Sequence, residues 1–545
     1  MRESYGKKVK RFKSFNFYTK KKEKPMKRQT MIFMFIVLPV CGSMNETLPS
    51  WHWAYDYIES LQMTGLFQDV YQMNRPFTRG DVARSILKTG YEIKQNEINL
   101  SGSELKRYKC LAAEFSDEIR SIQGRLDSVD VLELGGHLIE DIMQHKDEDV
   151  EFKGVYRSQI HVPVGKYLTL YNGINFDQYL VDDPDYVGKK WRGIVGYTEQ
   201  AYARAQFSRF RFRFGRDFLK WGPGQSGTLI FSDIARPMDH FMGSVDAGPF
   251  RFSYFISRLD DWKLSVALRD SLGDSWARRY VSCHRLDARF FNGRLQCAIS
   301  EAVTYGGVHR VPEWTYLNPF IFYHGAQLNE SGKTNTFGSI DILGYPTKCW
   351  QVYGTLMIDD IQIEKTCPGD LEPNEIGYLI GSRWSPVGGG IVSAEYVRIT
   401  NRTYKTPNPW ETFVHRGIPL GYPLGNDFDQ WQIGWTQWIG GAFRGEISYG
   451  QVRKGEGELF TPFDKPWLNY TVEQGYSEPF PTGVVEKQDL FYVKLNYYTS
   501  AHWGFKAEFQ SIAYKNYNHT EDLNETKSVW KLGVWLNGEA VVRMK

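Results

Sequence analysis

The sequence predicts a mainly β protein, a transmembrane antiparallel β-barrel of about 16 to 18 strands with a small N-terminal helical module. Three observations carry this prediction. From about residue 150 to the end, apolar and polar residues alternate with a period of two. Aromatic residues make up 15% of the chain although its mean hydropathy is −0.45, which suits strands that face lipid on one side and water on the other. Short connections between these segments alternate with long ones, as in outer-membrane barrels.

Residues 1–43 are predicted to be a leader with a secretory signal peptide. They hold 12 Lys/Arg and 2 Asp/Glu, and Met31–Val40 is an apolar run followed by the small residues Gly42 and Ser43. The remaining chain therefore carries a net charge of −7 instead of the overall +3, which argues against a nucleic-acid partner. Two alternatives stay open, a start at Met26 and a lipoprotein signal at Cys41.

Residues 44–100 are predicted to form a helical module with two helices between Trp51 and Tyr91. Thr78 and Asp81 have the spacing of a variant capping box at the start of the second helix. The stretch Pro76-Phe77-Thr78-Arg79-Gly80-Asp81 resembles the S-layer homology motif, and the resemblance implies a periplasmic module that binds peptidoglycan or its attached polymer. The candidate cell-wall-binding residues are Trp53, Thr78, Arg79 and Asp81. The alternative is a helical plug that uses the same residues as core and cap.

Residues 101–149 are predicted to be a helical spacer, and residues 150–545 the barrel, with outer-membrane lipid around it. Alternation at Trp262, Leu264, Val266 and Leu268 predicts one of its strands. A soluble β-sandwich or propeller would also alternate, but apolar faces that end in Trp and Tyr favour the membrane barrel. The position of residues 537–545 stays open, because Asn537-Gly538 has the composition of a further turn.

Asn292-Gly293 predicts a tight hairpin and thereby sets the register of its two strands. In that register Phe290 faces Leu295 and Ala288 faces Cys297. Cys283 then lies on the opposite face of the sheet from Cys297, so the two cysteines are not expected to form a disulfide.

Three arginines alternate with three phenylalanines between Arg209 and Phe214. Because Phe210, Phe212 and Phe214 share one face, the sequence predicts that Arg209, Arg211 and Arg213 face the barrel lumen. Two roles stay open for them: pairing with lumenal acids such as Asp287, or binding an anionic polysaccharide, because guanidinium groups match carboxylates.

A longer set of motifs resembles the Wzi-type capsule assembly family. They are Arg216-Asp217, Trp221-Gly222-Pro223-Gly224, Ser232-Asp233, Ala235-Arg236-Pro237, Tyr316-Leu317-Asn318-Pro319, His415-Arg416-Gly417, Pro419-Leu420-Gly421 and Leu424-Gly425. The resemblance implies an outer-membrane lectin that organises capsular or other extracellular polysaccharide. Its further candidate sugar-binding residues are Arg216, Lys220, Trp221, Arg236 and His240. Trp221 could stack on a sugar, although the alternative is an ordinary loop in the barrel mouth.

The sequence disfavours catalysis, because it contains no G-x-S-x-G, H-E-x-x-H or P-loop motif and no zinc-like Cys/His spacing. No cofactor or metal is expected. The preferred function is non-catalytic polysaccharide binding at the outer membrane. The alternatives are a porin-like anion or sugar channel and a purely structural tether between outer membrane and peptidoglycan. The sequence leaves the oligomeric state open.

Overall fold

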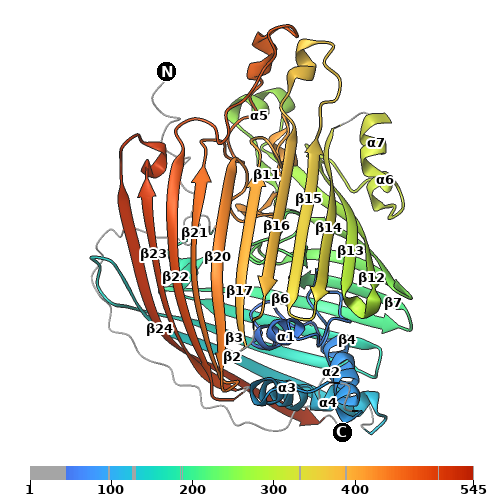
Figure 1. Ribbon diagram of the computed structural model, residues 1–545. Coiled ribbons are helices and arrows are strands. Elements are labelled where there is room, and N and C mark those ends of the chain that lie inside the picture. The colour runs from blue at the N-terminus through green and yellow to red at the C-terminus, as the bar shows by residue number, and fades with distance from the viewer. Residues whose placement is uncertain are drawn as a thin grey trace.

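The computed structural model is a closed antiparallel β-barrel with a helical module at one end (Figure 1). The structure describes residues 44–95, 98–125, 131–183, 186, 188–329, 333–386, 389–500 and 502–543. Within these ranges eighteen long strands form the wall, which confirms the predicted fold class and agrees with the predicted strand number. The leader and signal-peptide prediction for residues 1–43 lies outside the described residues.

The wall strands follow one another around the barrel in chain order, each antiparallel to its neighbours. They are β2 (Val131–His145), β3 (Glu151–Val164), β4 (Leu168–Asp177), β6 (Ile194–Phe207), β7 (Phe210–Asp217), β9 (Met238–Ala247), β10 (Phe250–Arg258), β12 (Trp276–Phe290), β13 (Leu295–Gly307), β14 (Thr334–Thr347), β15 (Trp350–Asp360), β16 (Glu375–Trp384), β17 (Gly390–Ile399), β20 (Phe428–Ile439), β21 (Phe443–Lys454), β22 (Glu486–Tyr498), β23 (Trp503–Lys515) and β24 (Glu525–Arg543). β2 pairs with both β3 and β24 and so closes the barrel. Because the ring is closed, the wall has no free edge.

Shorter elements lie at the ends of the barrel and inside it. The two-residue strands are β1 (Asn74–Arg75), β5 (Lys190–Trp191), β8 (Lys220–Trp221), β11 (Trp262–Lys263), β18 (Val414–His415) and β19 (Ile418–Pro419). The α-helices are α1 (Ala54–Gln62), α2 (Arg79–Lys94), α3 (Gly102–Glu114), α4 (Ser116–Ile122), α5 (Val266–Leu272), α6 (Trp314–Leu317) and α7 (Tyr323–Asn329). Of the helices in the described ranges, none combines the length and apolar character needed to span a membrane.

The two ends of the barrel differ. Turns such as 208–209, 248–249 and 440–442 connect strands at one end, whereas segments such as 218–237 and 400–427 connect them at the other. In Figure 1 the short-turn end is at the bottom, where α1 to α4 lie, and the long connections extend at the top. This asymmetry is the one that the sequence predicts for an outer-membrane barrel.

The wall separates an apolar outer face from a polar inner face. Phe210, Phe212 and Phe214 are 53%, 41% and 70% exposed on the outside, as predicted. The hairpin of β12 and β13 has the predicted register, with Ala288 opposite Cys297. Cys283 is buried on the inner face, and both it and Cys297 are free.

Two details of the predicted boundaries are wrong, and one position that the sequence left open is now assigned. The barrel begins at Val131, because the expected spacer is helical only as far as Ile122. Asn537-Gly538 forms no turn, since β24 continues through it and pairs with β2 as far as Arg543. Residues 266–272 are α5 instead of a strand, because the Ser265 hydroxyl caps the helix start and Gly273 ends it with a φ of 73°.

Candidate functional site

The N-terminal module is hydrogen-bonded to the interior of the barrel. β1 pairs with β8, which places Asn74 opposite Trp221. The Asn74 amide donates to Asp287 Oδ2 on the inner wall at 2.8 Å and accepts from Trp221 Nε1 at 3.1 Å. The Gln72 backbone N–H donates to Gln296 Oε1 of the wall at 3.0 Å. The module is therefore a plug, which is the alternative that the sequence left open.

Trp53 and Thr78, two of the candidate cell-wall-binding residues, belong to the core of the plug. Trp53 is 8% exposed and packs edge-on against Tyr57, with 5.0 Å between ring centroids. Thr78 Oγ1 accepts a hydrogen bond from the Asp81 backbone N–H at 3.0 Å, so it is the N-cap of α2, as predicted. Both side chains are used for packing and capping, and neither presents a free surface to a ligand.

Arg79, the third of these candidates, is the centre of a buried ion-pair cluster. Its guanidinium contacts Glu114 at 3.1 Å and Glu118 at 2.5 Å, and both acids lie on the helical segment after α2. Burial by itself lowers the pKa of Arg79, but Glu118 and Glu114 raise this pKa well above its usual value. Arg79 therefore stays charged and joins α2 to α3 and α4.

Asp81, the fourth candidate, connects the plug to the wall. It accepts two hydrogen bonds from Arg211 of β7, at 2.7 and 3.1 Å, and one from the more exposed Arg84, at 2.7 Å. Burial by itself raises the pKa of Asp81, but Arg211 and its neighbour Arg251 hold this pKa well below its usual value. Its carboxylate is thus ionised and engaged inside the protein.

The predicted row of lumenal arginines, Arg209, Arg211 and Arg213, is present in part. Arg211 and Arg213 face the lumen, but Arg209 lies exposed in the turn between β6 and β7, because pairing of these strands ends at Phe210. Arg213 contacts Asp217 at 2.5 Å and donates from Nε to His240 Nε2 at 2.9 Å. Arg211 and Arg213 are therefore both paired with groups of the protein, which was the first of the two predicted roles.

Two of the long connections fold back into the barrel and meet there. The 218–237 and 400–427 segments are joined by hydrogen bonds from Ser232 N to Leu420 O at 2.8 Å and from Tyr422 Oη to Ser226 Oγ at 2.9 Å. Trp221 is 1% exposed and packs against aromatic rings of the same core. The sugar-stacking role predicted for Trp221 is wrong for this arrangement, because both faces of its ring are covered.

The plug and the two infolded segments leave little space in the lumen. A cavity between the plug and β6, β7, β9 and β10 has a volume of about 40 Å³, and another beside the Gly222-Pro223-Gly224 loop has about 20 Å³. Each has room for only a few water molecules. In the described part of the chain, these two cavities beside the plug are too small for a sugar ring.

Of the remaining predicted sugar-binding residues, Arg216 and Arg236 lie near the ends of strands that carry long connections, whereas Lys220 lies inside the barrel, opposite Arg75 of the plug. Arg216 pairs with Asp239 at 2.5 Å, Arg236 pairs with Asp183 at 2.7 Å, and Lys220 lies 3.8 Å from Asp233. These basic residues are thus paired singly with acids, and Arg216 faces outward from β7 rather than into the lumen.

Arg416, which was not among the predicted site residues, lies near two of them. It occupies the tight turn between β18 and β19 with a φ of 50°, and its backbone N–H donates to Asp260 at 2.8 Å. Burial, together with the positive charges of Arg216 and Arg236, lowers the pKa of Arg416. In the described part of the chain its guanidinium has no ion-pair partner within 4 Å. The His415-Arg416-Gly417 motif was visible in the sequence, but nothing local indicated that Arg416 would come under the electrostatic influence of Arg236.

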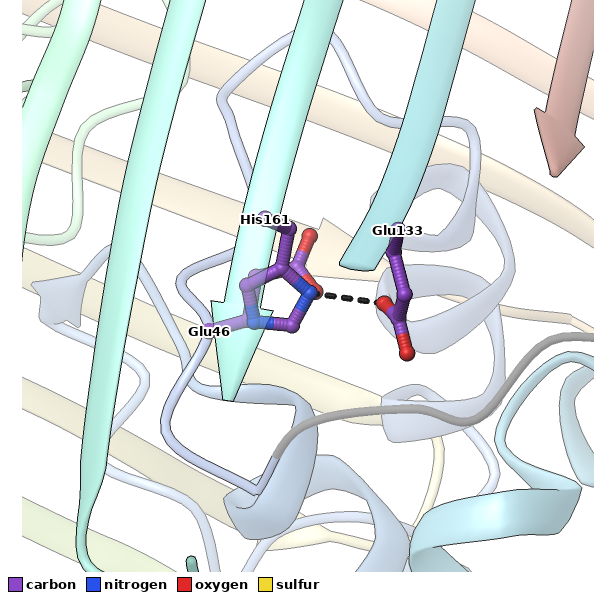
Figure 2. Close-up of side chains that lie close together, drawn as sticks. All are labelled: Glu46, Glu133 and His161. Atoms are coloured by element: carbon purple, nitrogen blue, oxygen red, sulfur yellow. Dashed lines mark hydrogen bonds and ion pairs between the residues drawn. The ribbon is translucent and has the colours of Figure 1, made fainter. Parts of the chain in front are cut away.

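Among the residues that the structure describes, one cluster has the composition of a metal site. Figure 2 shows His161 of β3 beside Glu133 of β2 and Glu46 of the segment before α1. The His161 Nδ1 atom lies 2.7 Å from Glu133 and 3.5 Å from Glu46, and the potential ligand atoms all lie within 4.8 Å of one another. Such a trio could hold a divalent cation. The shortest contact already has the length of a direct hydrogen bond. The cluster therefore joins the N-terminal segment to the wall without needing a metal ion.

Comparison with known proteins identifies the family. The family model of the capsule assembly protein Wzi matches residues 139–528. The chain belongs to the Wzi family. Among solved structures it is similar to Wzi of Escherichia coli, described as an outer membrane protein involved in group 1 capsule assembly and as a carbohydrate-binding β-barrel. The identity is 14% and the TM-score 0.56, over 88% of this chain and 97% of that chain.

More distant barrels are also similar. OpdK of Pseudomonas aeruginosa has 10% identity and a TM-score of 0.43, over 75% of this chain and 99% of that chain. A loop-deletion mutant of OmpT of Vibrio cholerae has 11% identity and a TM-score of 0.34, over 75% of this chain and 100% of that chain. A search of curated proteins gives no match.

The motifs that resemble the Wzi family serve mainly to build the interior. Trp221 and Gly222 bond to the plug strand, since the Gly222 N–H donates to Met73 O at 2.9 Å. Leu420 is fully buried where the two infolded segments meet. Arg236 and Arg416, by contrast, come from two of these motifs, are only partly buried, and are near enough for the charge of Arg236 to lower the pKa of Arg416. The Wzi-family signature therefore combines buried residues that fill the lumen with partly exposed basic residues of the long connections.

Proposed function

We propose that this Wzi-family protein is a non-catalytic, lectin-like polysaccharide-binding protein that takes part in capsule or exopolysaccharide assembly at the outer membrane. The observation that carries the proposal is a Wzi-family barrel whose lumen is filled from both ends, which leaves the rim of long connections as the surface for a polymer. The same filling disfavours the porin-like alternative, because a channel needs an open path through the barrel.

The binding surface that we propose is a rim patch made of Lys190, Trp191, Arg236 and Arg416. Arg236 contacts Asp183 of the 178–193 connection, and the Lys190 ammonium donates to the Asp183 carbonyl oxygen at 3.0 Å. These contacts bring Arg236 to the connection that carries Trp191, which is 60% exposed.

The rim patch has the chemistry of a site for acidic sugar. Arg416 offers a half-buried guanidinium without a carboxylate partner among the described residues, and guanidinium groups bind carboxylates through paired hydrogen bonds. The exposed ring of Trp191 offers a flat apolar face of the kind on which a sugar ring can lie. We infer that the ligand is a polysaccharide with uronic acid or other carboxylated residues.

Binding of the purified full-length protein to an array of acidic and neutral bacterial polysaccharides tests the proposal. The variants are Arg236→Gln/Arg416→Gln and Trp191→Ala, and Arg209→Gln is the matched control because Arg209 is exposed at the opposite end. We expect selective binding of acidic polymers, a loss of affinity of about tenfold or more in the double variant, and no change in the control. Absence of binding to every polymer would overturn the proposal. Equal affinity of all variants would show that the rim patch is not the binding surface.

The orientation follows from the proposal. With the long connections at the cell surface, the plug faces the periplasm, as in other outer-membrane barrels with short periplasmic turns. Binding of peptidoglycan by the plug stays a prediction, and co-sedimentation with purified peptidoglycan tests it. The four residues that suggested it are engaged internally, so such binding would have to use the exposed face of the module around Tyr91.

A further inference from the structure

The cavity between the plug and the wall is lined by an unusual concentration of arginine. Its volume is about 40 Å³, and its plug side is formed by Thr47, Pro76, Thr78 and Asp81. The arginines around it are Arg75, Arg204, Arg211, Arg213 and Arg251. Guanidinium groups do not lose their charge in proteins, so this cavity carries a large positive charge that must be balanced.

Four of the five arginines have carboxylate partners. Arg75 contacts Glu59 at 2.9 Å, and Arg213 contacts Asp217 at 2.5 Å. Arg211 and Arg251 are paired with two carboxylates. Asp81 contacts Arg211 at 2.7 Å, and Asp246 contacts Arg211 at 2.8 Å and Arg251 at 2.6 Å. The five guanidinium groups that line the cavity are thus matched by four carboxylates, of which Asp81 also contacts the more exposed Arg84 and Glu59 also lies 3.9 Å from Arg383.

Arg204 of β6 is the unmatched cation. Its side chain is buried, with 7% of the residue exposed, and it lies opposite Arg213 in the strand pairing. Its Nη1 atom donates to the Asn45 backbone oxygen at 3.1 Å. Across the residues that the structure describes, no carboxylate lies within ion-pair distance of this guanidinium.

Further donors around the cavity also lack acceptors. The Nε atoms of Arg211 and Arg75 are buried and have no hydrogen-bond partner. A buried charge without a counter-charge destabilises the folded protein, and each unsatisfied donor destabilises it further. One negative charge inside the cavity would compensate the unmatched guanidinium and offer an acceptor to donors that line the cavity.

We propose that the cavity binds one small inorganic anion of the size of chloride, which holds the plug against the barrel wall. The charge of the ion follows from the single unmatched guanidinium. Its size follows from the volume, which is room for about three water molecules and too little for a hydrated oxyanion or a sugar carboxylate. The site is independent of the rim patch, because it lies inside the barrel at the contact between plug and wall.

Bromide, which replaces chloride and scatters anomalously, tests the site directly. Crystals of the full-length protein grown in bromide are expected to show an anomalous peak in the cavity beside Arg204. A map with bromide only on the surface, or with no peak, would overturn the proposal.

Hydrogen exchange of residues 79–94 in solution provides the second measurement. The buffers contain chloride or gluconate, an anion too large for the cavity, at the same ionic strength. At chloride concentrations of about ten times the dissociation constant, exchange of α2 should be about tenfold slower than in gluconate. Equal rates in the two buffers would contradict the proposal.

Arg204→Met removes the unmatched charge while keeping a long apolar stem, and Arg209→Met is the matched control at the exposed turn. We expect the first variant to exchange at the same rate in both buffers and the control to keep the chloride effect. An undiminished chloride effect in Arg204→Met would place the anion elsewhere and overturn the proposal. If Arg204→Met does not assemble, the bromide map of the unchanged protein decides the question.

Discussion

Asp81 is the residue at which docking of the plug can be weakened without touching the barrel wall. Asp81→Asn keeps the size of the side chain but removes the charge that faces Arg211. Separating a buried ion pair by neutralising one partner costs about 3–5 kcal/mol when the other charge is left alone. Arg211 keeps Asp246 at 2.8 Å, so we expect a smaller loss in the free energy of docking, about 2–3 kcal/mol.

Hydrogen exchange of α2 measures this loss. Each 1.4 kcal/mol corresponds to a factor of ten, so exchange of residues 79–94 should become about 30 to 150 times faster, while the wall strands keep their protection. Arg84→Gln is the matched control, because it removes the more exposed partner of the same carboxylate and should change exchange by less than about threefold.

The double variant Asp81→Asn/Arg211→Gln separates the ion pair from other effects. If the two residues act through each other, its loss should be clearly smaller than the sum of the two single losses. Unchanged exchange in Asp81→Asn, or strictly additive losses, would refute the role assigned to this pair.

Two further predictions concern pH and the lumenal core. Because the pKa of Asp81 is held well below its value in an unfolded chain, its contribution to docking is complete above about pH 5 and is lost progressively as the pH falls further. Protection of α2 against hydrogen exchange, corrected for intrinsic exchange, should therefore be constant from neutral pH to about pH 5 and then fall. Asp81→Asn should flatten this pH dependence. An unchanged pH profile in the variant would contradict the role of Asp81. Trp221→Ala should lower the free energy of unfolding by about 3–5 kcal/mol, measured by denaturant titration, because it empties a buried site and leaves Asn74 without its donor. The folded fraction should keep its glycan affinity, and Trp314→Ala, at a residue that is 87% exposed, should change stability by less than about 0.5 kcal/mol.

Features that depend on neighbours in the chain were predictable from the sequence. Strand alternation follows from the pleat, which sends successive side chains to opposite faces, so the outward position of Phe210, Phe212 and Phe214 could be predicted. The hairpin at Asn292-Gly293 and the Thr78 cap are likewise local, and both have the predicted register or bond. The prediction was wrong at residues 262–272, where two local signals competed. The Ser265 cap and Gly273 favour a helix, and they outweighed the alternation that predicts a strand.

The sequence by itself therefore determined the barrel, its two unlike ends and its family, because these depend on periodicity, turn chemistry and motifs that can be read along the chain. Only the tertiary structure decided what those motifs do. Asp81 and Arg211 are 130 residues apart, and Asn74 and Trp221 are 147 apart, yet each pair forms one contact inside the closed barrel. A side chain that can bind a sugar can equally bind a protein carboxylate or fill a core. Which of these occurs depends on what the closed wall brings opposite it, and no local pattern carries that information.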